Sequence, residues 1–171
     1  KFVLASPIEH HSIRQDYQFP VDRYGIVDPQ EVLERVKLLR RQEKYLTMVS
    51  CMHVNNELGV IEPVKKIAEV AHECNLPFHV DAVQSVGHLA VDVKKMNCDF
   101  LSASGHKFGA MKGTGFLFTK DSSKLTSLIN GGKQESGKRP GTENVLGIIS
   151  MAAALEDAVE HMYERNNYIG G

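Results

Sequence analysis

Polar residues that could do chemistry follow directly on short apolar segments of this chain. Asp81 lies at the end of an apolar run, in the motif HVDAVQ at residues 79–84. A buried carboxylate at such a place is costly unless it meets a cation or several hydrogen-bond donors. Asp81 therefore indicates a site for a cationic ligand, or alternatively a cap on the helix that follows. When Asp81 is considered alone, the helix cap is the preferred interpretation.

A lysine follows a second apolar segment, in the motif SASGHK at residues 102–107. We expect Lys107 to be partly desolvated there, which lowers the pKa of an amine and lets it attack a carbonyl to form a Schiff base. Ser104 and His106 alternate along the chain and could both donate hydrogen bonds to one anion. The alternatives are a surface lysine whose amine reaches water and a purely structural histidine.

Two further segments could bind ligands. The motif HVNNELG at residues 53–59 contains adjacent Asn residues, which are typical of a turn because their side chains bond the local backbone. The segment at 131–142 is rich in glycine and basic, so its amides, Arg139 and Thr142 could hold a phosphate, unless it is a solvated loop. Residues 132–138 match most of a nucleotide phosphate-binding loop. Arg139 stands where that loop requires a magnesium-binding Ser or Thr, which disfavours nucleotide binding.

Helical and strand-like segments must position these residues, and they alternate along the chain. Asp28 followed by Pro29 is a typical helix start, and Pro63 begins a second helix that Asn75 and Pro77 end. Strands are expected at 45–54, 78–83, 98–103 and 115–119, and a last amphipathic helix at 144–162. This alternation predicts one α/β domain over residues 1–171: a mostly parallel sheet with helices on both faces and ligands beyond the carboxyl ends of its strands.

The composition excludes several function classes. Lys and Arg total 20 against 21 for Asp and Glu, so the chain lacks the basic excess of a protein that binds nucleic acid through its phosphates. The longest apolar run, at 147–155, is too short to span a membrane. Cys51, Cys74 and Cys98 form no C-x-x-C pair, which indicates free structural thiols in a reducing compartment. No His or Cys spacing indicates a metal site.

Taken together and in order, these motifs resemble those of the cysteine desulfurases, pyridoxal 5'-phosphate enzymes of the class V aminotransferase group. The matching segments are PIEH at 7–10, VNNELG at 54–59, HVDAVQ at 79–84, SGHK at 104–107 with KGTG at 112–115, and the loop at 131–142. The resemblance implies the large domain of a fold-type I pyridoxal-phosphate enzyme. Residues 1–171 would be the central part of that cofactor-binding domain, with further N- and C-terminal parts in the complete protein.

The resemblance also implies a role for each matching residue around the cofactor ring. Lys107 would hold the cofactor and then move protons at the substrate's α-carbon, while Asp81 would pair with the pyridinium nitrogen and keep the ring an electron sink. His10 would stack on the ring and assist proton transfer. Gln84 would bond the phenolic oxygen, and Asn56 would lie nearby on the substrate side.

Further residues would bind the phosphate and the substrate. Ser104 and His106 would bind the phosphate, and Thr142 would reach the phosphate of a neighbouring subunit, so that the site is built across a homodimer. Arg139 would contribute to substrate binding. The implied reaction removes sulfur from L-cysteine and leaves alanine and an enzyme persulfide. The sulfur would pass to an acceptor or scaffold protein of iron–sulfur cluster or thio-cofactor assembly, in the cytoplasm or the mitochondrial matrix.

The chain also departs from the family pattern. The segment at 12–19 is too short for the helix and strand that the family has there, and none of the cysteines matches the family's persulfide-forming cysteine. Ala110, Met111, Lys133 and Ser136 replace residues that are usual in the family's loops. Two alternatives therefore stay open. One is a selenocysteine lyase or another class V enzyme, and the other is a catalytically incomplete truncated chain that only folds or forms dimers.

Overall fold

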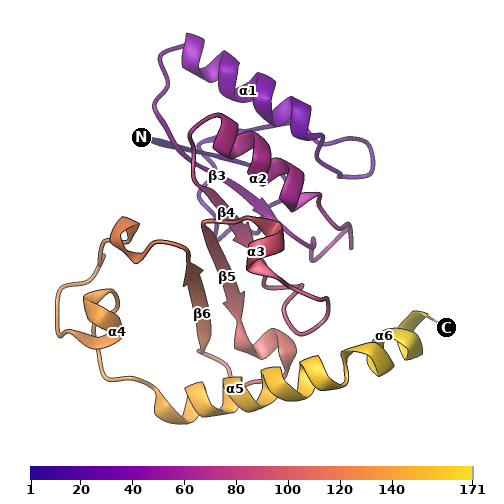
Figure 1. The fold of residues 1–171 in the computed structure, drawn as a ribbon, viewed down its shortest axis with the longest axis vertical. Coiled ribbons are helices and arrows are strands. Elements are labelled where there is room, and N and C mark those ends of the chain that lie inside the picture. The colour runs from indigo at the N-terminus through magenta and orange to yellow at the C-terminus, as the bar shows by residue number, and fades with distance from the viewer. Residues whose placement is uncertain (171) are drawn as a thin grey trace.

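The computed structural model describes residues 1–170, which form a six-stranded sheet with the strand order β2-β1-β3-β4-β5-β6 (Figure 1). The strands are β1 (Phe2–Ala5), β2 (Tyr17–Gln18), β3 (Leu46–Met52), β4 (Phe78–Asp81), β5 (Phe100–Ser104) and β6 (Gly115–Thr119). Neighbouring strands are parallel from β2 to β5, and β6 runs antiparallel to β5. The predicted α/β class with a mostly parallel sheet is confirmed.

The helices are α1 (Pro29–Arg41), α2 (Val64–Glu73), α3 (Val93–Met96), α4 (Gln134–Gly137), α5 (Val145–Glu160) and α6 (Met162–Gly170), with the short 3-10 turns η1 (Gly105–Phe108) and η2 (Ser122–Lys124). α1 begins as predicted, because Asp28 Oδ1 accepts a hydrogen bond of 2.9 Å from Gln30 N and Pro29 takes the first helical position. α2 begins directly after Pro63, and Asn75, with a φ of 53°, turns the chain toward β4.

One face of the sheet is apolar and lies beneath α1 and α2. These helices and α3 connect parallel strands, and right-handed crossovers in one direction place them on the same face. The strand register brings fully buried aliphatic and aromatic side chains together on that face: Leu4, Val49, Phe78, Val80 and Leu101. They form the hydrophobic core with the buried stripes of the helices, whose members are Val32, Val36, Leu39, Val64, Ile67, Ala68 and Ala71. Each large buried side chain contributes about 1.5–3 kcal/mol.

The opposite face of the central strands carries a polar row. His79 of β4 lies between two hydroxyls, with Nδ1 2.9 Å from Ser50 Oγ and Nε2 3.1 Å from Ser102 Oγ. Burial lowers the pKa of His79, although the charge of Asp81 offsets part of the shift, so the ring is neutral at pH 7. A neutral imidazole has one donor and one acceptor, which suits two hydroxyl partners. The row links β3, β4 and β5 directly beside Asp81.

As expected from the short segment at 12–19, the residues after His10 supply only the two-residue strand β2 at the sheet edge and no helix. Two other segments differ from the elements expected from the sequence. The last predicted helix ends at Glu160, and α6 continues the chain after a break at His161. Between η2 and α5, residues 125–143 bow away from the sheet and contain only the short helix α4 (Figure 1).

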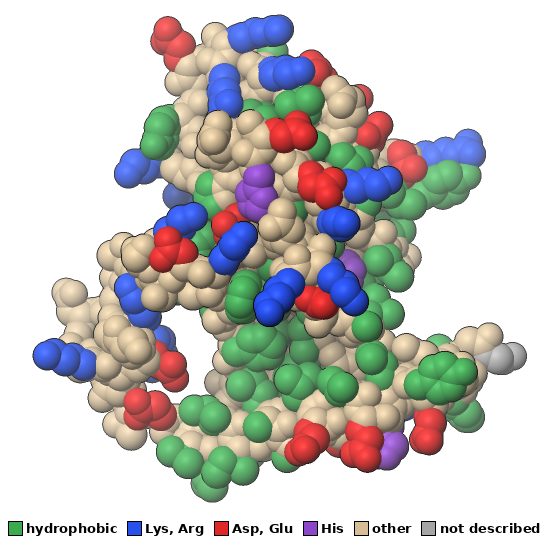
Figure 2. All heavy atoms as spheres, viewed as in Figure 1, with side chains coloured by type: hydrophobic (Ala, Val, Ile, Leu, Met, Phe, Trp, Pro, Cys, Tyr) green, Lys and Arg blue, Asp and Glu red, His purple; other side chains and the backbone are tan. Residues whose placement is uncertain are grey.

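α5 packs mainly by one side on η1 and on the turn that follows β4. Ala158 is buried against Gly87 and Phe108, whereas Leu146 and Ile149 are 76% and 60% exposed. Figure 2 shows the resulting row of hydrophobic side chains along α5. Within residues 1–170, no helix combines the length and the apolar character needed to cross a membrane.

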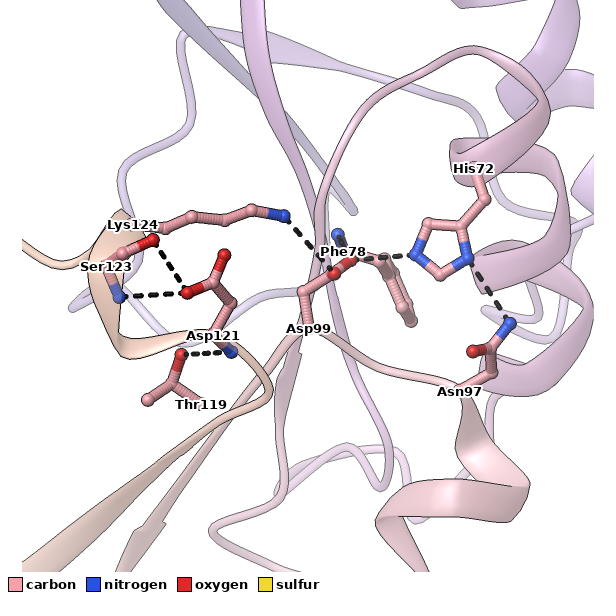
Figure 3. A network of polar contacts seen from close by, with 8 residues as sticks. All are labelled: His72, Phe78, Asn97, Asp99, Thr119, Asp121, Ser123 and Lys124. Atoms are coloured by element: carbon pink, nitrogen blue, oxygen red, sulfur yellow. Dashed lines mark hydrogen bonds and ion pairs between the residues drawn. The ribbon is translucent and has the colours of Figure 1, made fainter.

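A polar network ties α2 to the amino-terminal ends of β4 and β5 (Figure 3). Asp99 Oδ2 lies 2.7 Å from His72 Nε2 and accepts a hydrogen bond of 2.9 Å from Phe78 N. Lys124 Nζ lies 3.9 Å from Asp99 Oδ1, and Asn97 Nδ2 lies 3.3 Å from His72 Nδ1. Burial raises the pKa of Asp99, but the donors from Phe78 and His72 and the nearby positive charges outweigh burial and lower the pKa below its usual value.

Replacing Asp99 with Asn is expected to lower the free energy of unfolding at pH 7 by about 1–3 kcal/mol, because His72 and Lys124 lose their charged partner. The pKa of Asp99 is depressed in the folded protein, so its stabilising effect is present above the unfolded value of 3.8 and is lost as the pH falls through the folded value. Urea unfolding at about pH 7 and about pH 3 measures the difference, which should shrink at the lower pH.

Asp157→Asn is the matched control for this prediction. Asp157 also contacts a histidine and a cation, His161 and Arg165, but its side chain is 57% exposed. Its removal should lower the free energy of unfolding less than removal of the Asp99 carboxylate does, because water screens an exposed ion pair. A loss for Asp99→Asn that is no larger than the control, or that does not change with pH, would contradict the role assigned to the network.

Candidate active site

The residues that could do chemistry gather at one edge of the sheet. The loop after β1 carries His10, the loop after β3 carries Asn56, β4 ends at Asp81, and η1 after β5 carries Lys107. β1, β3, β4 and β5 are parallel neighbours, so their carboxyl ends form a row along this edge. This is the edge at which open α/β sheets bind ligands.

Asp81 is the buried acid of this edge, with 5% of its surface exposed. Its Oδ1 accepts a hydrogen bond of 2.9 Å from Val83 N, and its Oδ2 accepts none from residues 1–170. The chain that follows makes successive turns and no α-helix before α3. The alternative of a helix cap is therefore wrong, and the carboxylate keeps a free oxygen.

Neither histidine beside Asp81 supplies a counter-charge. Burial lowers the pKa of His53, whose backbone N–H donates to the Asp81 carbonyl oxygen at 2.9 Å, and burial also lowers the pKa of His79. Both rings are therefore neutral at pH 7. A buried carboxylate with a free oxygen and neutral neighbours is best matched by a cationic group on a ligand.

Lys107 lies in η1, the turn that leaves the end of β5. Phe108 anchors this turn, and Gly87, with a φ of 80°, makes room for it, because a Cβ there would lie 2.7 Å from the Phe108 Cβ. The same turn exposes Lys107, so the predicted partial desolvation is wrong within residues 1–170. His88 Nε2 lies 3.0 Å from the Lys107 carbonyl oxygen and holds the backbone, while no residue of 1–170 hydrogen-bonds the amine.

Ser104 and His106 contact each other at the same place. Ser104 Oγ lies 2.8 Å from His106 Nδ1, so the hydroxyl and the ring form one unit at the end of β5. His106 is exposed, and Ser104 is half-buried. Gln84 is also half-buried, three residues beyond Asp81. These side chains border the same edge as Asp81 and Lys107.

The adjacent Asn residues have different environments. Asn55 is buried, and its Oδ1 accepts hydrogen bonds of 2.8 Å from Glu57 N and 2.7 Å from Leu58 N. Its Nδ2 donates to the Ile8 carbonyl oxygen at 2.7 Å. Asn55 thus forms the turn that the sequence predicts and also fixes the loop after β1. Asn56 is exposed beside it, where a ligand can reach its side chain.

His10 occupies the tip of the loop after β1. Its ring is exposed and lies against the ring of His11, with 4.0 Å between the centroids. Its Nδ1 lies 2.8 Å from Ser12 Oγ. The loop therefore carries an exposed imidazole that follows the carboxyl end of β1.

Two buried acids beneath this edge were missed by sequence reasoning. Glu9 is 8% exposed and accepts a hydrogen bond of 2.5 Å from Met52 N, whereas Glu62 is 2% exposed and accepts one of 2.9 Å from Val27 N. The second carboxyl oxygen of each is buried without a hydrogen-bond partner. The available signal was weak: each acid follows an isoleucine in a short apolar segment.

The structure does not bring Arg139 and Thr142 to this edge. Both lie on the segment between α4 and α5 that bows away from the sheet (Figure 1). Arg139 Nη1 donates to the Pro140 carbonyl oxygen at 2.8 Å, and Thr142 is exposed. No hydrogen bond among residues 1–170 links either residue to Asp81 or Lys107.

The cysteines are unsuited to nucleophilic chemistry. Cys51, Cys74 and Cys98 are free and buried. Burial raises the pKa of each thiol. A thiol with a raised pKa is rarely ionised and is a weak nucleophile. The burial of all three agrees with the predicted structural role.

Comparison with known proteins decides the family. The model of the aminotransferase class-V family matches residues 3–165. The chain belongs to the class-V aminotransferase family. This class-V chain is 45% identical over 175 residues to the cysteine desulfurase IscS of Clostridium botulinum, covering 96% of the chain and 43% of that protein. It spans about two fifths of the length of the curated relatives it matches.

Solved structures share the class-V fold. A NifS-like protein from Rickettsia africae superposes with a TM-score of 0.86 at 29% identity, over 95% of this chain and 46% of that one. A structure described as SspA in complex with cysteine gives a TM-score of 0.79 at 36% identity, over 91% and 47% of the two chains. The resemblance to the cysteine desulfurases is confirmed, as is the fold of type I pyridoxal-phosphate enzymes.

The residues of this class-V chain fit the family's cofactor. Pyridoxal phosphate has a basic ring nitrogen, an aldehyde and a phosphate. Asp81 offers a buried carboxylate without a protein counter-charge to the ring nitrogen, and Lys107 offers an exposed amine to the aldehyde. Ser104 and His106 offer hydrogen-bond donors at the same edge for the phosphate.

Proposed function

We propose that the natural polypeptide containing residues 1–171 is a pyridoxal-phosphate-dependent cysteine desulfurase, with this chain as the central part of its large cofactor-binding domain. The observation that carries the proposal is the row of His10, Asn56, Asp81 and Lys107 along the carboxyl edge of parallel strands. The free oxygen of buried Asp81 allows this row of residues to bind a cationic group of a ligand. The likeness to cysteine desulfurases over nearly the whole chain supports L-cysteine as the substrate.

The cofactor is proposed to be held from several sides. Lys107 attaches it covalently, Asp81 pairs with its ring nitrogen, and Gln84 bonds its phenolic oxygen. Ser104 and His106 bind its phosphate, and this pairing is supported by the 2.8 Å contact that already joins them. His10 covers the ring face.

When bound, pyridoxal phosphate supplies an electron sink that lets bonds at the substrate's α- and β-carbons break. Asp81 keeps its negative charge beside the ring nitrogen and so maintains that property. With the cofactor bound, the amine of Lys107 would move the proton at the substrate's α-carbon. Asn56 orients the substrate, whereas Arg139 lies on the segment that bows away from the sheet and does not reach this edge in its own chain. The sulfur leaves the β-carbon for a cysteine thiolate other than Cys51, Cys74 and Cys98, since those thiols are buried.

The proposed protein is a homodimer that passes sulfur to an acceptor or scaffold protein of iron–sulfur cluster or thio-cofactor assembly. The distance of the Thr142 segment from its own sheet edge supports the dimer, because a residue that does not reach its own site is free to serve a neighbouring one (Figure 1). The free thiols support a reducing compartment, the cytoplasm or the mitochondrial matrix.

The test is to purify the natural polypeptide with pyridoxal phosphate and assay L-cysteine, L-selenocysteine and L-alanine as substrates. We expect a visible cofactor absorption band, and alanine formed from cysteine in equal amount to the sulfur transferred to a thiol acceptor. A protein that binds the cofactor but forms no alanine from cysteine would contradict the proposal. A rate with selenocysteine far above that with cysteine would assign it to the lyases instead.

A further inference from the structure

The carboxyl group of Glu9 lies directly beneath the candidate site. Glu9 precedes His10 in the loop after β1, and its side chain turns inward instead of toward solvent. Its Oε1 accepts a hydrogen bond of 2.5 Å from Met52 N at the carboxyl end of β3, and its Oε2 is buried without a partner. An ionised carboxylate in that state would leave a charged oxygen unsolvated, which is more costly than a neutral acid.

The groups around Glu9 oppose its ionisation. Asp81 from β4 and Glu62 from the loop after β3 are both acids, and Cys51 of β3 is a thiol that burial keeps protonated. His53 in the same region is neutral, because burial lowers its pKa. Burial and the charge of Asp81, followed by that of Glu62, raise the pKa of Glu9 to about 8 against the opposing effect of the Met52 amide. Glu9 therefore carries a proton at pH 7.

We propose that Glu9 is a positioning residue that, in its neutral form, fastens the His10 loop to the end of β3 and leaves Asp81 as the charged carboxylate of the site. This inference rests on the proposed function for the role of His10 and Asp81. In this role Glu9 contacts neither the substrate nor the cofactor.

The loop that carries His10 is fastened at successive points to β3 and to the loop after β3. Ser6 N donates to the Ser50 carbonyl oxygen at 3.2 Å, and the Ile8 carbonyl oxygen accepts from Asn55 Nδ2 at 2.7 Å. The Glu9–Met52 bond is the last of these contacts before the exposed His10. Because the next side chain is the imidazole, loss of this contact would move the ring directly. If Glu9 were ionised, its negative charge would lie beside that of Asp81. The single cationic ring nitrogen of the cofactor could balance only one of these two charges.

A protonated Glu9 determines how the stability of the folded protein changes with pH. The pKa of Glu9 in the folded protein, about 8, exceeds its usual value of 4.5. Between these values the folded state binds a proton that the unfolded state has released, so stability falls as the pH rises from about 4.5 to about 8. Glu9→Gln keeps the size and the acceptor for Met52 N but cannot ionise. The gap in melting temperature between Glu9→Gln and wild type should therefore be small near pH 5 and widen to at least about 3 °C near pH 8.5.

The experiment uses the natural polypeptide as wild type, Glu9→Gln, Glu9→Ala and Glu62→Gln. Melting temperatures are measured without cofactor from pH 5 to 8.5, and the dissociation constant of pyridoxal phosphate is measured at pH 7. We expect Glu9→Gln to bind the cofactor within about threefold of wild type, and Glu9→Ala to bind at least about tenfold more weakly. Glu62→Gln is the matched control: it removes another buried acid of raised pKa but no anchor of the His10 loop, so its affinity should equal that of wild type.

Several outcomes would overturn the proposal. Tenfold weaker binding by Glu9→Gln would show that the charge of Glu9 is needed, and a gap in melting temperature that is constant with pH would show that Glu9 is not neutral. Wild-type affinity in Glu9→Ala, or an equal loss in Glu62→Gln, would remove the positioning role. If wild type itself binds no pyridoxal phosphate, the proposed function fails, and the gap in melting temperature alone decides whether Glu9 is the neutral anchor of its loop.

Discussion

Replacing Lys107 with alanine is expected to abolish covalent attachment of pyridoxal phosphate and to lower alanine formation from L-cysteine at least about a thousandfold. The substitution removes the amine that attaches the cofactor and also the base that moves the proton at the substrate's α-carbon, an effect of about 10²–10⁴ on its own. Lys107 is exposed in η1, so its truncation should leave the fold intact. Borohydride reduction followed by peptide mass mapping locates the adduct, and alanine release measures the rate.

The matched control is Lys66→Ala. Lys66 is also an exposed lysine, but it lies on α2, away from the carboxyl edge of the sheet. It should keep wild-type adduct formation and alanine release. An adduct that persists in Lys107→Ala, or adducts spread evenly over surface lysines in wild type, would show that η1 does not hold the cofactor.

The sequence predicts those elements whose ends are determined by local chemistry. Asp28 and Pro29 begin α1 where expected, and the apolar run at 115–119 forms β6 with the predicted bounds. The direction of β6 was not predictable in this way, because apolar alternation is the same for parallel and antiparallel strands. What reverses the chain is η1 together with the tight turn at Gly113, whose φ is 85°. The short length of the connection then forbids a parallel crossover.

The exposure of Lys107 shows a second limit of reasoning from the sequence. A lysine that follows a buried strand was expected to share the burial of that strand. η1 breaks this relation, because its helical turn faces Gly105 and Phe108 inward and His106 and Lys107 outward. Strand ends predict which residues reach the edge of the sheet, but the first turn after the strand decides which of them are buried.

The roles of Asn55 and Glu9 could not be predicted from the sequence either. Motif matching favoured Asn56 for a ligand and left Asn55 and Glu9 unassigned, yet both unassigned residues hold the loop that carries His10. Their roles depend on contacts between the loops after β1 and β3, which are more than forty residues apart in sequence. Neither periodicity nor spacing within one segment reports such contacts.

Replacing Asp81 with Asn is expected to weaken pyridoxal-phosphate binding at least about tenfold and to lower alanine formation about a hundredfold or more. The proposed pairing of Asp81 with the ring nitrogen is a charge-assisted contact at a buried carboxylate, and losing the charged partner of such a contact costs about 1.5–3 kcal/mol. Asn retains an oxygen that can accept from Val83 N, so the turn after β4 should persist. Absorbance titration measures the affinity of the cofactor, and alanine release measures the rate.

This substitution separates the charge of Asp81 from its place in the fold. The neutral histidines His53 and His79 cannot compensate for the lost charge, and the hydroxyl row around His79 still holds β4 in register. The melting temperature without cofactor should therefore not fall, since a buried charge that lacks a counter-charge is itself destabilising. Asp92→Asn, which removes a partly exposed carboxylate at the start of α3, is the control and should keep full affinity. If Asp81→Asn binds the cofactor as tightly as wild type, the buried carboxylate serves the turn at Val83 alone and the cofactor binds elsewhere.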